Sequence, residues 1–130
     1  MHILVDTSVW IDYFKTGVNS SFLDTLIDEN LIVTNDIILA EIIPFLKIKK
    51  QSKLIRLLHN VKKLNLKIDW EEIILFQVKC LNSGIYGIGI PDLIIVQNAK
   101  QTNCEIYSLD KHFKIIQPIL DIDIFEKEIR

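Results

Sequence analysis

The feature that most constrains the fold is a short apolar run near the start of the chain that ends on a carboxylate. Ile3, Leu4 and Val5 are followed directly by Asp6 and then by two hydroxyl residues. A continuous apolar run without polar alternation is typical of a parallel strand that is covered on both faces. Ligand sites in such sheets lie beyond the carboxyl ends of the strands, so we expect chemistry at Asp6. The alternative from this residue alone is that Asp6 caps a helix over residues 9–14.

Length and composition point to one domain that spans residues 1–130. Of the 130 residues, 49% are hydrophobic, which is ample material for one core. No apolar segment approaches the roughly 18 residues that suggest a membrane span. Because Asp6 interrupts the first apolar run, we expect no secretory leader and a cytoplasmic protein. Cys80 and Cys104 are then expected to be free thiols.

The net charge of -2 conceals an uneven distribution of basic residues. Residues 42–68 contain no Asp or Glu, and they hold eight of the fifteen Lys and Arg side chains. Such an asymmetry indicates a surface that faces a polyanion. The alternative is a solvated helical face whose lysines keep the domain soluble.

Apolar segments alternate with helical patterns along the chain, which predicts an α/β fold with a mostly parallel sheet. Strands are predicted at residues 3–5, 31–34, 64–68 and 105–109, with a last one at 122–125. Helices are predicted at residues 9–14 and 21–29, from 35 through 41 with an end or kink near Pro44, over 47–60 as one basic helix or a pair, over 70–82 with Asp69 as its cap, and from Pro91 onward. Residues 84–89 are predicted to form a glycine-rich loop, and residues 111–113 to turn the chain.

Four carboxylates are expected to meet at one edge of this sheet. Asp6 and Asp110 follow predicted strands, Glu41 lies on the helix after the second strand, and Asp92 stands in the first turn of a helix. Clustered carboxylates repel one another unless some are protonated or a cation neutralises them. A hard divalent cation such as Mg²⁺ or Mn²⁺ suits a site made of oxygen ligands.

At these residues the sequence resembles the PIN-domain ribonucleases, in particular the VapC-like toxins of type II toxin-antitoxin systems. The resemblance lies in "LVDTSVWIDYF", "VTNDIILAEI", "GIGIPDLIIVQNA" and "YSLDKHF", which follow the family's order over nearly the whole chain. It implies a PIN-like fold with a five-stranded parallel sheet flanked by helices. It also implies that Asp6, Glu41, Asp92 and Asp110 are the catalytic residues and the Mg²⁺ or Mn²⁺ ligands, with Thr7, Ser8 and Ser108 as orienting or substrate-contacting hydroxyls.

The function implied by the resemblance is that of a metal-dependent endoribonuclease whose products carry 5′-phosphate and 3′-hydroxyl ends. The expected partners are an RNA substrate, a cognate VapB-like antitoxin that occupies the active-site groove, and a second copy in a homodimer. Because four acids repel a polyanion, we expect the basic segment from Lys47 to Lys67 to guide the RNA, with Lys49, Lys50 and Lys53 contacting its backbone.

Two other functions remain open from the residues. A phosphatase of the haloacid dehalogenase type also has an Asp after its first strand, but it needs a second acid where this chain has Ser8. A receiver-like or binding module with a metal-holding acidic pocket would cleave nothing. We assign no metal to His2, His59 or His112, which lack a zinc-like spacing.

Overall fold

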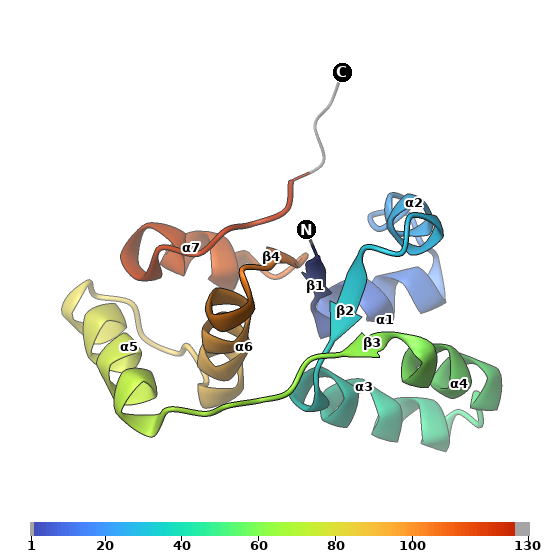
Figure 1. Ribbon diagram of the computed structural model, residues 1–130, viewed down its shortest axis with the longest axis horizontal. Coiled ribbons are helices and arrows are strands. Elements are labelled where there is room, and N and C mark those ends of the chain that lie inside the picture. The colour runs from blue at the N-terminus through green and yellow to red at the C-terminus, as the bar shows by residue number, and fades with distance from the viewer. Residues whose placement is uncertain (1, 127–130) are drawn as a thin grey trace.

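The computed structural model describes residues 2–126, and it shows a small parallel sheet flanked by seven helices (Figure 1). The sheet has the strand order β3-β2-β1-β4, and every neighbouring pair is parallel. Its strands are β1 (Ile3–Val5), β2 (Ile32–Thr34), β3 (Lys62–Lys63) and β4 (Glu105–Tyr107). The helices are α1 (Thr7–Lys15), α2 (Leu23–Asp28), α3 (Asp36–Ile48), α4 (Ser52–Asn60), α5 (Trp70–Asn82), α6 (Ile90–Thr102) and α7 (Lys111–Leu120). The α/β class predicted from the sequence is confirmed.

The strand β1 lies inside the sheet, between β2 and β4. Leu4 pairs with Val33 on one side and with Ile106 on the other, and all three residues of β1 are buried. In Figure 1, α1 to α4 lie to the right of β1 and α5 to α7 to its left. Because all the strands are parallel, their carboxyl ends share one edge, and Asp6 lies there as predicted.

The sheet is smaller than predicted, because residues 2–126 form four strands instead of five. The predicted strand at residues 64–68 is wrong, and the two-residue strand β3 precedes it. The strand β2 ends at Thr34, whose carbonyl accepts the last hydrogen bond between the two strands, from the Leu64 amide at 2.8 Å. Residues 65–68 therefore have no strand beside them with which to pair. Residues 122–125 form only one isolated bridge, from Ile124 to Ile106, and not the predicted strand.

The structure contains one helix that the sequence pattern did not predict, and a second helix that extends beyond its predicted end. Residues 111–113, expected to turn the chain, begin α7 instead. Phe113, Ile116 and Leu120 are buried on one face of α7, at the spacing of an amphipathic helix. The helix α3 continues past Pro44 to Ile48, and α4 follows as a separate helix. Residues 47–60, predicted as one basic helix or a pair, therefore contain the end of α3, a turn and α4.

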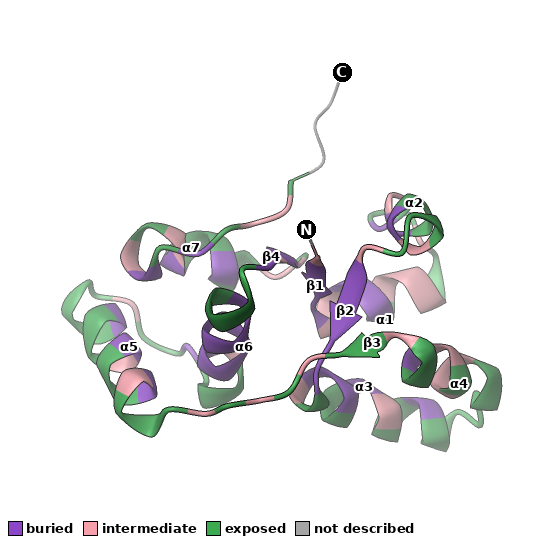
Figure 2. Ribbon diagram, in the orientation of Figure 1, coloured by how far each residue is buried: buried purple, intermediate pink, exposed green. Residues whose placement is uncertain are grey.

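The core is formed around α6, whose residues 93–99 are all buried (Figure 2). This agrees with the apolar character of its sequence on every side. Trp10 is completely buried, whereas Trp70 is 58% exposed. Cys80 and Cys104 are buried and free. Within the part of the chain that the structure describes, no helix is long and apolar enough to cross a membrane.

Candidate metal centre

Each of the four carboxylates is carried to the site by a different element. Asp6 follows β1 and is the N-cap of α1, while Asp110 is the N-cap of α7. Glu41 lies in the second turn of α3, and Asp92 stands in the first turn of α6. The negative charge of Asp6 raises the pKa of both Glu41 and Asp92, and the charge of Asp110 also raises that of Asp92. The structure therefore brings the four predicted acids into one electrostatic cluster.

The pKa values of Glu41 and Asp92 are both raised above the usual range of a carboxyl group. Partial desolvation is the largest cause for each, and repulsion by neighbouring carboxylates adds to it. A hydrogen bond from Thr7 opposes the shift in the pKa of Glu41, and His112 opposes it for Asp92. A bound cation would relieve both causes, because it compensates the charge that solvent no longer screens.

Three hydroxyl groups hold two of these carboxylates in place. The Oδ2 atom of Asp6 accepts hydrogen bonds from Ser8 Oγ at 2.8 Å and from Ser108 Oγ at 2.9 Å. Thr7 Oγ1 donates to Glu41 Oε1 at 3.0 Å. The Ser8 hydroxyl also accepts from the Leu109 amide at 3.0 Å, which ties the first turn of α1 to the loop after β4. The structure thus places these three hydroxyls beside the acids, as predicted.

Asp6 acts both as a helix cap and as a member of the acidic cluster. Its capping bond from the Ser8 amide is long, at 3.4 Å, whereas the two hydroxyl bonds are shorter. The residue is only 6% exposed, and a carboxylate so deeply buried requires several polar partners. The two interpretations of Asp6 drawn from the sequence are therefore compatible with each other.

His112 lies beside two of the acids, although the sequence pattern assigned it no role. Its Nδ1 atom is 3.4 Å from Asp110 Oδ1 and 3.7 Å from Asp92 Oδ2. One ligand atom from each of the three residues lies within 4.8 Å of the others. The three histidines do not have a zinc-like spacing in the sequence, so that pattern does not identify His112. The useful signal was its position two residues after Asp110, on a helix that the sequence pattern did not predict.

The donor set fits a hard divalent cation. Carboxylate oxygens dominate it, and the imidazole of His112 adds one nitrogen at its rim. The side chains of Asp92, Asp110 and His112 are 22%, 39% and 46% exposed, so the cluster is open to solvent on one side. Such an arrangement leaves room for a phosphate group and for water beside a cation held by few protein ligands.

The structure does not place the three predicted lysines among the acids. Lys49 follows α3 eight residues after Glu41, which corresponds to about 12 Å along a helix axis. Lys49 lines a groove of about 460 Å³ between α1, α3 and α4 together with Phe14 and Phe45. Lys53, from α4, lines a different cavity. Lys50 lies in the turn between α3 and α4, with a left-handed φ of 55°.

Asn35 and Asn98 form a buried polar pair that the sequence reasoning missed. Asn35 caps α3 by accepting from the Ile38 amide at 3.0 Å, and it donates to Asn98 Oδ1 at 2.9 Å. Asn98 in turn donates to the Asn65 carbonyl at 3.1 Å. Because α3 carries Glu41 and α6 carries Asp92, this pair ties together two of the elements that form the site.

Comparison with known proteins identifies what the chain is similar to. A family model described as PIN domain matches residues 3–117. No curated protein matches the chain in sequence. One similar solved structure is VapBC2 from Rickettsia felis bound to a DNA fragment from the VapBC2 promoter. It aligns at 20% identity with a TM-score of 0.77, and the alignment covers 98% of this chain and 100% of that one. VapBC-1 from nontypeable Haemophilus influenzae aligns at 22% identity and a TM-score of 0.72, covering 97% and 98%. FitAcB from Neisseria gonorrhoeae aligns at 21% identity and a TM-score of 0.70, covering 95% and 96%.

Proposed function

Because the chain belongs to the PIN-domain family, we propose that it is a metal-dependent endoribonuclease and the toxin of a toxin-antitoxin pair. The observation that carries the proposal is the convergence of four carboxylates from four elements. Thr7, next to Asp6, donates to Glu41, and His112 lies beside both Asp92 and Asp110. The site contains no second acid two residues after Asp6, where a haloacid dehalogenase-type phosphatase needs one. Ser8 stands there, and its hydroxyl donates to Asp6.

In this proposal Asp6, Glu41, Asp92 and Asp110 hold Mg²⁺ or Mn²⁺. When bound, the cation polarises the scissile phosphate and makes an attacking water more acidic. Ser8 and Ser108 fix the orientation of the Asp6 carboxylate through its Oδ2 atom. Thr7 does the same for Glu41.

Cleavage of RNA by the purified protein is the direct test. Incubation of total RNA with Mg²⁺, with Mn²⁺ or with EDTA should yield fragments only with metal, and their ends should be 5′-phosphate and 3′-hydroxyl. Asp6→Asn, Glu41→Gln and Asp92→Asn should each abolish cleavage and leave the fold intact. The matched control is Asp28→Asn, because Asp28 is an exposed acid on α2. Intact RNA under all conditions would instead favour a module that binds metal without catalysis.

The proposed partners are a VapB-like antitoxin and a second copy of the chain. The support for the antitoxin is that the VapBC structures aligned above are complexes by name. For the homodimer, the support is an exposed apolar face on α5, where Trp70, Ile74 and Val78 border a hollow of about 270 Å³. Sedimentation of the protein should show a dimer, and Val78→Asp should shift it to a monomer. A monomeric wild type would contradict the homodimer.

We further propose that Lys49, Lys50 and Lys53 contact the RNA backbone. RNA binding should be measured over a salt series for the Asp92→Asn protein, which is expected not to cleave RNA, with and without Lys→Gln changes at the three positions. Three lost phosphate contacts should make the slope of log affinity against log salt shallower by roughly 2, at about 0.7 per contact. An unchanged slope, with loss of antitoxin binding, would assign these lysines to the antitoxin.

A further inference from the structure

A second concave site lies at the edge of the sheet opposite the acidic cluster. A cavity of about 490 Å³ opens between α2, α4 and the beginnings of β2 and β3. Ile32 and Lys62, which are the first residues of these two parallel strands, line it. Asp6 and Asp110 follow the carboxyl ends of strands, so the sheet separates the cavity from the cluster of acids. Of the residues that line it, the proposed function uses only Lys53, as a contact to the RNA backbone.

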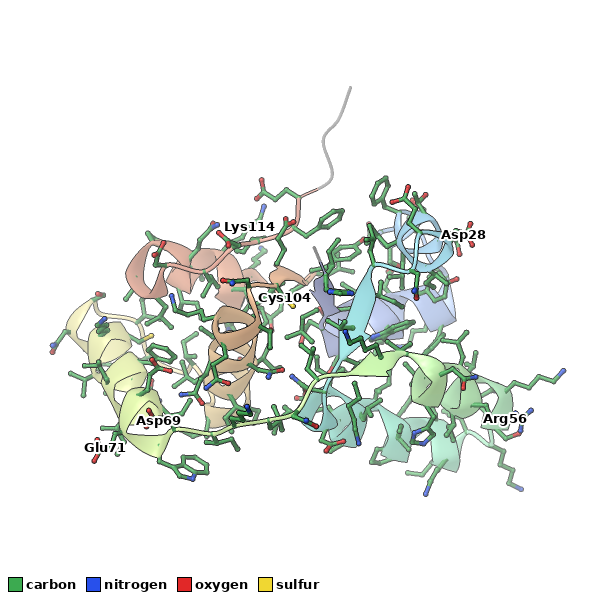
Figure 3. All side chains as sticks on the ribbon, in the orientation of Figure 1. Asp28, Arg56, Asp69, Glu71, Cys104 and Lys114 are labelled. Carbon is green, nitrogen blue, oxygen red and sulfur yellow. The ribbon has the colours of Figure 1, made fainter. Side chains whose placement is uncertain are left out.

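The cavity is strongly basic. Lys53, Arg56 and Lys62 line it, and no Asp or Glu does so. Among the described residues none of these three cations forms a salt bridge, whereas the neighbouring Lys63 pairs with Asp36 at 3.2 Å. Figure 3 shows Arg56 on α4 clearly separated from Asp28 on α2, so that acid does not neutralise it. A concave surface with charges of one sign concentrates ions of the opposite sign.

The three cations converge from two different elements. Lys53 and Arg56 are three residues apart on α4, which places them on the same face of that helix. Lys62 comes from β3 and lines the same cavity. An arginine beside two lysines suits a phosphate group, because the guanidinium can donate two parallel hydrogen bonds to its oxygens.

The rest of the lining suits a planar heterocycle. Two carboxamide residues, Asn30 and Asn60, provide donors and acceptors. Four apolar residues provide a surface on which a ring can pack: Ile27, Ile32, Leu57 and Val61. The volume also lies within the roughly 300–1,000 Å³ of typical ligand pockets.

We propose that this cavity is a nucleotide-binding site, in which the phosphate lies among Lys53, Arg56 and Lys62 and the base packs on the apolar wall beside Asn60. The nucleotide is either free or one unit of an RNA strand. The site goes beyond the proposed cleavage activity. Because its test measures binding and not cleavage, its outcome is independent of whether the acidic cluster is catalytic.

The test is calorimetric titration of the full chain with adenosine monophosphate, uridine monophosphate and inorganic phosphate at low salt. We expect saturable binding of a nucleotide that is tighter than that of inorganic phosphate. Arg56→Gln and Lys53→Gln should each weaken it about tenfold or more, because each removes a charge-assisted contact. Lys67→Gln is the matched control, since Lys67 is exposed and basic but does not line the cavity.

Asn60→Leu separates a nucleotide site from a simple anion site. The change keeps the branched shape of the side chain and removes the carboxamide, so nucleotide affinity should fall while phosphate affinity stays unchanged. An RNA oligonucleotide titrated into the Asp92→Asn protein identifies the source of the nucleotide. If Arg56→Gln weakens only oligonucleotide binding, the unit belongs to RNA; if it weakens both, free nucleotide also binds.

Three results would overturn the proposal. One is that neither the nucleotides nor the oligonucleotide binds saturably. Another is binding that Arg56→Gln and Lys53→Gln leave at the wild-type affinity, with thermal melting showing that both variants are folded. Equal affinity for inorganic phosphate and nucleotides would likewise exclude the base as a ligand.

Discussion

At the scale of single residues, the buried Asp6 carboxylate depends on hydroxyl groups that are far away in the sequence. Ser108 donates to Asp6 Oδ2 at 2.9 Å and accepts from the Asp110 amide at 2.9 Å. The hydroxyl thus joins the first acid of the cluster to the last. A buried carboxylate that loses such a partner is desolvated without a compensating hydrogen bond, which destabilises the folded state.

Replacing Ser108 with Ala should therefore destabilise the protein and impair the site. Because two hydrogen bonds at a partly buried position are lost, we expect unfolding to become easier by roughly 1–3 kcal/mol. Urea denaturation measures this change, and RNA cleavage should fall as Asp6 loses its orientation. Ser83→Ala is the control, since among the described residues the Ser83 side chain makes no hydrogen bond. Equal stability of the two variants would contradict the prediction.

Tyr13 gives a pH dependence that is independent of the acidic cluster. Its hydroxyl donates to Asp24, and this bond, with desolvation, raises the pKa of Tyr13 from 10.0 to about 12. Between these two values the folded state keeps the proton that the unfolded state loses, so this contribution to stability is complete below pH 10 and is lost as pH rises to 12.

The corresponding variant is Tyr13→Phe, which removes the ionising group and its hydrogen bond. Its urea midpoint should be lower than that of the wild type at pH 8, and the difference should shrink by pH 12. Tyr86→Phe is the control, because Tyr86 is 75% exposed and should leave the profile unchanged. A difference that stays constant from pH 8 to 12 would contradict the assignment.

At the scale of elements, local signals predicted helix starts better than strand lengths. The cap Asp69 and the helix over residues 70–82 were predicted correctly, because Asp69 accepts from the Glu72 amide as a cap should. The strands depend instead on distant pairing. The residues after Lys63 have apolar character, but β2 is too short to pair with them, and no local pattern reveals this.

Pro44 shows how packing overrides a local helix breaker. It leaves the carbonyl of Ala40 without its usual amide donor, and yet α3 continues because Ile42 and Leu46 are buried on its inner face. Pro44→Ala restores a donor at an exposed position. We expect a stabilisation of about 2 kcal/mol. This is the cost of proline inside a helix, about 3 kcal/mol, minus up to about 1 kcal/mol because alanine makes the unfolded chain more flexible. Thermal or urea unfolding checks this, and a loss of stability would contradict it.

At the scale of the whole molecule, the sequence predicted which acids would meet but not how the surrounding residues support them. Asp6, Glu41 and Asp92 follow from the topology of a parallel sheet, because its carboxyl ends share one edge. His112 and the Asn35–Asn98 pair depend on side-chain directions between elements far apart in the sequence. The separation of Lys53 from the acids likewise depends on where α4 packs.

In the proposed function, metal binding by the acidic cluster would add to the stability of the whole fold. Folding partly desolvates Glu41 and Asp92 and brings them close to other carboxylates, which raises the pKa of both. A cation that binds only the folded protein offsets this cost, and free metal at about 100 times Kd should stabilise the fold by roughly 2.7 kcal/mol. Differential scanning calorimetry with Mg²⁺ or Mn²⁺ measures this gain, which Asp28→Asn should preserve and Asp92→Asn should reduce.

The same linkage sets the pH dependence of the metal effect. Metal and protons compete for these carboxylates, and raised pKa values let protons compete at a higher pH than for ordinary acids. In the metal-free protein, the two groups favour the folded state below their unfolded pKa values, and this contribution is lost as pH rises through the folded values. The stabilisation by metal should therefore be largest at neutral pH and shrink on acidification. Absence of any response to millimolar metal at neutral pH would mean that the four carboxylates do not form a cation site in the free protein.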